Sequence, residues 1–150
     1  MSWYMMSVPK RSAKNSMTTN IPYEGIDEYV RSHYSSSLMS DTKWIKLLST
    51  IGDAFEEEVH SIYKTIHSEE VHKYSFYSAD EQFFAEPLTY KEVEWIEFPT
   101  EYNDYLNSNN RKSGLAVYSQ DVGIMLTLVN SIGFFDTVMK DKSLRVYAYR

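Results

Sequence analysis

Three stretches of the chain repeat apolar residues at intervals of three and four, the spacing that places them on one side of an α-helix. The first, residues 25–34, predicts a short amphipathic helix. The second begins at Ser40 or Asp41, either of which can cap a helix through its side-chain oxygen, and ends at Gly52. The third covers residues 121–133. The side chains expected on the apolar sides are Ile26, Tyr29, Val30, Tyr34, Trp44, Leu47, Leu48, Ile51, Ile124, Met125, Leu128 and Ile132.

Other stretches alternate in polarity, which is typical of β-strands. Residues 92–98 alternate up to a proline, and residues 115–118 form a shorter run of the same kind. Near the end of the chain, residues 134–139 and 144–149 predict a hairpin around a polar turn. These elements together predict the α+β class: a mainly antiparallel sheet with helices packed on one face.

Two stretches are harder to assign. Residues 53–77 have apolar side chains at helical spacing up to Ile66, yet their β-branched and aromatic content also suits two strands joined near residues 68–70. We favour a helix up to Ile66 and a strand from Val71. The polar span after residue 99 predicts a loop, with one helical turn at residues 102–106.

The apolar pattern also predicts the organisation of the chain. Residues 1–38 are assigned to an N-terminal extension, partly disordered, and residues 39–150 to a single domain. Cysteine is absent, which fits a reducing compartment and excludes thiolate chemistry. No stretch has the length of a signal peptide core or a membrane span, so a cytoplasmic location without membrane contact is expected.

Negative charge is concentrated in the middle of the chain. Residues 52–104 hold fourteen acidic and three basic side chains, a local net charge of −11 against −6 for the whole chain. The sequence pI of about 5.2 argues against nucleic-acid binding, which needs clustered Lys and Arg. Thirteen Tyr and three Trp accompany the charge, and acidic, aromatic surfaces suit contact with a basic protein.

Candidate catalytic and metal-binding motifs are weak. The sequence Glu57, Glu58, Val59, His60 recurs as residues 69–72, giving two Glu-x-x-His spacings of the kind found in di-iron helical bundles. On one helix the two copies would point 120° apart, and the chain lacks the four long helices of such a bundle. No nucleophile elbow or Gly-rich phosphate loop is present. We therefore expect no metal, no other cofactor and no enzymatic activity.

Three segments resemble a group of small bacterial α+β proteins of unassigned function. They are residues 41–44 at the start of a helix, residues 90–97 in a strand and residues 145–149 at the end of the chain. The resemblance covers about residues 39–150. Small acidic proteins of this type are often encoded beside polymorphic or contact-dependent toxins as immunity partners, so the resemblance implies an inhibitor.

The expected function is that of an immunity-type inhibitor, which covers the substrate groove of a cationic toxin such as a nuclease. The alternatives are an adaptor or regulatory protein for another basic partner and, third, a small hydrolase. The acids could instead protect an edge strand from aggregation, and the tyrosines could pack at the rim of the sheet. The residues predicted to contact the partner are Glu56, Glu57, Glu58, Tyr90, Glu92, Glu94, Glu97 and Tyr102.

Overall fold

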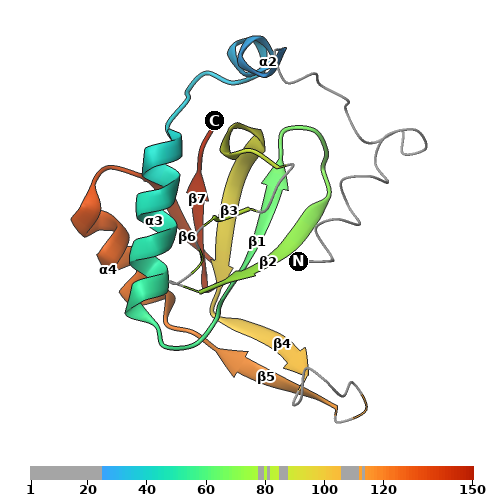
Figure 1. The fold of residues 1–150 in the computed structure, drawn as a ribbon, viewed down its shortest axis with the longest axis vertical. Helices are drawn as coiled ribbons and strands as arrows, with labels where there is room; N and C mark the ends of the chain where they lie inside the picture. The colour runs from blue at the N-terminus through green and yellow to red at the C-terminus, as the bar shows by residue number, and fades with distance from the viewer. Residues whose placement is uncertain (1–24, 78–79, 81, 85–87, 106–111, 113) are drawn as a thin grey trace.

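A computed structural model describes residues 25–77, 80, 82–84, 88–105, 112 and 114–150. A five-stranded antiparallel sheet lies at its centre, in the order β2-β1-β3-β7-β6. Helices α3 and α4 lie together on one side of this sheet, and a separate two-stranded hairpin projects from one end (Figure 1). The predicted α+β class, with a mainly antiparallel sheet, is confirmed.

The three predicted helices are present. Helix α2 spans Ile26–His33, α3 spans Asp41–Ala54 and α4 spans Val122–Ile132. Both predicted caps are formed: Ser40 Oγ accepts a hydrogen bond from the Lys43 amide at 3.2 Å, and Asp121 Oδ1 accepts one from the Ile124 amide at 3.0 Å. These side chains satisfy amide donors that a helix start leaves unpaired, as expected from their position.

Helix α4 packs on a side that overlaps the predicted one: Met125 is buried and Ile132 packs against the core as predicted, but Ile124 does not. Its buried residues are Val122, Met125 and Val129, whereas Ile124 is half exposed. The sequence alone did not distinguish the two sides, because the helix is apolar nearly all round. The prediction for Ile124 is therefore wrong.

The strands of the main sheet are β1 Val59–Thr65, β2 Val71–Phe76, β3 Val93–Pro99, β6 Asp136–Lys140 and β7 Ser143–Tyr147. The predicted terminal hairpin is confirmed, and its turn residues Asp141 and Lys142 both have positive φ, as two-residue hairpin turns require. Strand β3 begins one residue later than predicted, because Glu92 belongs to the short 3-10 helix η2, Tyr90–Glu92.

The helix favoured up to Ile66 is wrong, and the alternative of two strands is right. Helix α3 ends at Ala54, and residues 59–65 form β1, which pairs with both β2 and β3. A strand in the middle of a sheet gains partners for its backbone on both sides, and the β-branched and aromatic side chains suit its pleat. This tertiary pairing outweighed the helical spacing.

The helical turn predicted at residues 102–106 is also wrong. Strand β4, Glu101–Tyr105, pairs instead with β5, Leu115–Ser119. The predicted strand at residues 115–118 is confirmed, but it joins this separate hairpin and not the main sheet. Residues 106–111 and 113 of the predicted loop, like residues 1–24 of the predicted extension, lie outside the described residues.

Helix α2 lies at the end of the sheet opposite the hairpin β4–β5 (Figure 1). Although it belongs to the stretch assigned to the extension, Ile26 and Val30 are buried in the hydrophobic core. The core also holds Trp44 and Ile51 of α3 and Phe98 of β3. The boundary at residue 38 stays a prediction, and these two side chains make it testable.

Candidate functional site

The site lies where the hairpin β4–β5 meets the first residues of β1. The register of β1 with β3 pairs Ile62 with Glu97, so two residues further along His60 comes opposite Pro99. Proline has no amide hydrogen to donate to the His60 carbonyl. The Gln120 side chain takes this role: its Nε2 donates to the carbonyls of His60 at 2.7 Å and Pro99 at 2.8 Å. Its Oε1 accepts from the His60 amide at 3.2 Å, which joins the hairpin to the sheet.

Two side chains position the ring of His60, one at its face and one at its Nδ1 atom. Tyr102 of β4 stacks on it, with ring centroids 3.7 Å apart and an angle of 20° between the planes. Ser75, the cross-strand neighbour of His60 in β2, places its Oγ 3.2 Å from Nδ1. Burial lowers the pKa of His60; Lys73 lowers it further, while Asp104 opposes the shift. The imidazole is therefore biased towards its neutral form.

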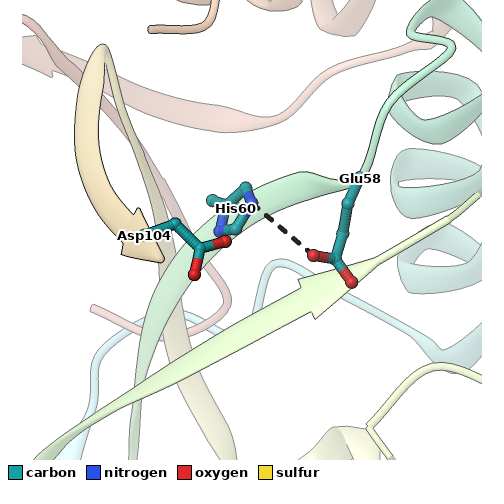
Figure 2. A group of neighbouring side chains, drawn as sticks. All are labelled: Glu58, His60 and Asp104. Carbon is teal, nitrogen blue, oxygen red and sulfur yellow. Dashed lines mark ion pairs between the residues drawn. The ribbon is translucent and has the colours of Figure 1, made fainter. Parts of the chain in front are cut away.

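Two carboxylates lie beside this ring. Glu58 Oε1 lies 3.6 Å from His60 Nε2, and Asp104 of β4 reaches the same place from the hairpin (Figure 2). One ligand atom from each of the three residues lies within 4.8 Å of the other two. We call them the Glu58–His60–Asp104 cluster. Burial raises the pKa of Glu58, and the negative charges of Asp104 and Asp80 raise it further.

The strand geometry explains which residues gather here. In a strand, residues two apart point to the same side and residues three apart do not. Glu58 and His60 therefore lie on the same side. The Glu-x-x-His spacing from Glu57 to His60 would place both residues on one side of a helix, but in an extended chain it does not bring them together. The sequence carries an alternating Glu-x-His signal that could have revealed this pair once β1 was recognised. Asp104 had no such signal, because only the docking of the hairpin brings it near.

The exposed loop before β1 adds further predicted residues to this place. Glu56 and Glu57 are exposed, and Glu58 follows them into the cluster. Burial raises the pKa of the Tyr102 hydroxyl, and Glu57, Asp104 and Glu58 each raise it further. Four of the eight predicted contact residues thus lie in one region: Glu56, Glu57, Glu58 and Tyr102. Tyr118, which stacks on Tyr102 with centroids 5.7 Å apart, extends its aromatic side.

The three other predicted glutamates lie elsewhere, and each has an internal partner. Glu92 accepts a hydrogen bond from Thr89 and lies 2.8 Å from His67 Nε2. Glu94 forms an ion pair of 2.8 Å with Lys64 and also accepts from the Tyr34 hydroxyl.

Glu97 forms an ion pair of 2.8 Å with Arg145, whose guanidinium stacks on Trp95 at 3.7 Å. Glu92, Glu94 and Glu97 therefore do not present a shared row of exposed charge, since Glu92 precedes the strand and each carboxylate faces its own partner.

Tyr90 lies in a different part of the molecule. It lines a cavity of about 430 Å³ between α2, the start of α3 and η2. The Trp44 ring lies parallel to its own, with centroids 6.3 Å apart, and an ion pair between Asp27 and Lys91 lies at the rim. Tyr90 and Tyr102 are thus at opposite ends of the sheet.

The cluster region offers a surface for positive charge. It combines several carboxylates, the His60 imidazole and two stacked tyrosines, which suits a cationic group of a partner or a metal ion.

In the described part of the chain, no helix is long and apolar enough to cross a membrane.

Comparisons with known proteins place the chain in a family. No curated protein and no solved structure matches it. A family model described as a family of unknown function, DUF6678, matches residues 26–150. The matched range begins at the first residue of α2, includes the hairpin and reaches the last residue of the chain. Since this range covers most of the sequence, the chain belongs to the family of unknown function DUF6678.

Proposed function

We propose that this chain is a non-catalytic acidic binding protein, whose contact surface for a basic protein lies around the Glu58–His60–Asp104 cluster. The observation that carries the proposal is the convergence of like charges there. Beyond the effect of burial, Asp104 and Asp80 raise the pKa of Glu58. The pKa of the Tyr102 hydroxyl is likewise raised by burial first and then by Glu57, Asp104 and Glu58. Neighbouring carboxylates repel one another, so the approach of a positive group lowers their electrostatic free energy.

The contrast with the other acids supports this location. Glu92, Glu94 and Glu97 already face His67, Lys64 and Arg145, so a basic partner would have to compete with these internal contacts. Glu56 and Glu57 are exposed, and their charges face solvent from the loop before β1. A ring such as Tyr102 beside them can give large contact area at low entropic cost.

We further propose that the partner is a cationic toxin domain, and that this protein acts as its immunity-type inhibitor. A nuclease must be positive where it binds phosphate. A negative surface of matching shape is steered to that groove and excludes the substrate from it. This partner class rests on the charge of the surface and on the type of small acidic protein that the sequence resembles.

Co-expression with the product of the neighbouring gene tests the proposal. A one-to-one complex that survives purification and protects cells from the neighbour's toxicity is the expected result. The variant Glu56→Lys/Glu57→Lys should slow association at low ionic strength, because steering charges act mainly on the on-rate.

The matched control is Asp27→Lys/Glu28→Lys, which reverses two exposed charges on α2, at the end of the sheet opposite the hairpin (Figure 1). It should leave the association rate within about two-fold of the wild type. An equal reduction of the association rate in both variants would mean that only the net charge of the protein affects association. A neighbour product that neither binds nor harms cells would contradict the inhibitor proposal.

A further inference from the structure

The Glu58–His60–Asp104 cluster has the spacing of a metal site. Glu58 Oε1 and His60 Nε2 are 3.6 Å apart, too long for a hydrogen bond. Two ligand atoms held about 2.1 Å from one tetrahedral ion are roughly 3.4 Å apart, which is close to this separation. The third ligand atom, from Asp104, lies within 4.8 Å of the other two. Bringing the Asp104 oxygen from at most 4.8 Å to about 3.4 Å from the other two donors needs a side-chain shift of up to roughly 1.4 Å.

The ring of His60 is also oriented as a metal ligand requires. Ser75 Oγ lies 3.2 Å from Nδ1, and stacking on Tyr102 fixes the plane of the ring. When Nδ1 donates its proton to Ser75, the lone pair is on Nε2, the nitrogen that faces Glu58. A hydrogen bond from the second ring nitrogen is the usual way in which proteins orient a ligating histidine.

An ion could reach these donors from solvent. The His60 side chain is 18% exposed and that of Glu58 36%. The two carboxylates carry negative charge in a place where Asp80 adds more, so a divalent cation would relieve their repulsion. The three side chains come from the start of β1 and from the hairpin strand β4, where the sheet and the hairpin meet (Figure 2).

We propose that Glu58, His60 and Asp104 bind one divalent transition-metal ion, with Zn²⁺ as the best fit. An imidazole nitrogen with two carboxylates is a donor set that Zn²⁺ accepts, whereas Mg²⁺ and Ca²⁺ prefer oxygen ligands alone. Three protein ligands leave at least one coordination position for water. This inference goes beyond the proposed function, because it needs no protein partner.

The ion would also act on that function. A bound Zn²⁺ adds two positive charges at the acidic surface, so it should weaken the binding of a basic partner. By linkage, the partner would weaken Zn²⁺ binding by the same factor. The two proposals can fail separately, because metal binding is measured on the isolated protein and partner binding can be measured in the presence of EDTA.

The test uses the untagged 150-residue chain, stripped with EDTA and dialysed against metal-free buffer. Calorimetric titration with ZnCl₂ should give saturable binding at one equivalent. With free Zn²⁺ at a hundred times its dissociation constant, the melting temperature should rise by roughly 5 °C or more. The same titration with MgCl₂ should show no saturable binding.

Three substitutions locate the site: Glu58→Gln, His60→Gln and Asp104→Asn should each weaken Zn²⁺ binding by at least about 10-fold. The matched control is Glu57→Gln, which removes one negative charge from the adjacent exposed residue and should change affinity less than about two-fold. Equal weakening by Glu57→Gln and Glu58→Gln would show attraction by charge alone and overturn the site.

A second measurement on the wild type covers the case in which a substituted protein fails to fold. In NMR spectra, Zn²⁺ should shift the ring signals of His60 while those of His33, His67 and His72 stay in place. Shifts at another histidine, or the absence of saturable binding up to 1 mM Zn²⁺, would refute the proposal.

Discussion

Gln120 holds the backbone of His60 at both its amide and its carbonyl. A third hydrogen bond, from Gln120 Nε2 to the Pro99 carbonyl, completes this set. The Gln120 side chain thus supplies the hydrogen bond between strands that Pro99, which lacks an amide hydrogen, cannot donate. The hairpin β4–β5 and the strand β1 are thereby connected through hydrogen bonds that depend on a single residue.

Substitution Gln120→Ala should therefore destabilise the protein by about 2 kcal/mol, because it leaves partly buried backbone groups without partners. Urea unfolding measures the loss, and hydrogen exchange of the His60 amide should accelerate. The control Asn103→Ala changes an exposed residue of β4 and should cost less than about 0.5 kcal/mol. Unchanged exchange at His60 would mean that other contacts hold the hairpin.

Breaking the ion pair between Lys64 and Glu94 should destabilise the protein, because the pair is largely buried. Their side chains are 11% and 16% exposed, and the pair lies in the middle of the sheet. Lys64→Met leaves Glu94 with the Tyr34 hydroxyl alone, so we expect a loss of about 3 kcal/mol, as for other broken buried pairs.

The matched control for that substitution is Lys73→Met, at an exposed position of the neighbouring strand β2. It should change the free energy of unfolding by less than about 0.5 kcal/mol in urea denaturation. If the two variants unfold at the same urea concentration, the buried pair adds nothing to stability.

Helix α2 should be required for full stability. Ile26→Ala removes a side chain that is 1% exposed in the core, which should cost about 3 kcal/mol and lower the melting temperature by roughly 10 °C. The control Glu28→Ala, on the exposed side of the same helix, should shift it by less than about 2 °C.

Deletion of residues 1–38 removes Ile26 and Val30 together. A cooperative transition should remain, since the sheet and the helices α3 and α4 are intact, but at a lower temperature than in a chain that starts at residue 25. Equal melting of the two truncated chains would show that α2 does not support the core.

Acid should destabilise the protein through His60 and His72. Burial lowers the pKa of both in the folded state, although Asp104 and Glu70 oppose the shift. A histidine with a lowered pKa contributes stability above its unfolded value of about 6.5, and this stability is lost as the pH falls through the folded value. The free energy of unfolding should therefore decrease from pH 7 to pH 5.

The variant His60→Gln should flatten this dependence, whereas His33→Gln, on the exposed side of α2, should not. Glu58 acts with the opposite sign, because burial, Asp104 and Asp80 raise its pKa above 4.5. The folded state disfavours the charged form of Glu58 relative to the unfolded chain, so Glu58→Gln should raise the free energy of unfolding at pH 7. Unfolding curves at several pH values decide both points.

The sequence predicted the fold class and most helices and strands, because their periodicity and caps are local signals. It failed at residues 59–65, where pairing with strands on both sides outweighed helical spacing. It also failed at residues 102–106, where the partner strand lies beyond a polar span. Both errors arise from contacts between residues far apart in sequence, which periodicity does not report.

The candidate site was predictable to a similar extent. The density of acids drew attention to Glu56, Glu57, Glu58 and Tyr102, which the structure brings into one region. It could not separate these residues from Glu92, Glu94 and Glu97. The partners of those three are distant in sequence: His67 lies in the turn after β1, Lys64 in β1 and Arg145 in β7. Nothing local to Asp104 indicated that it would meet His60.

The hairpin β4–β5 meets the main sheet through the stack of Tyr102 on His60 and the hydrogen bonds of Gln120. The amino-acid sequences of these two parts can change to different extents. The five-stranded sheet carries the core, while the hairpin supplies Asp104 and Tyr102 from outside it. Substitutions along the hairpin can thus change the proposed contact surface without repacking the interior. Within the family, this predicts that selectivity changes by exchanging hairpins on a constant body, which chimeric proteins could demonstrate.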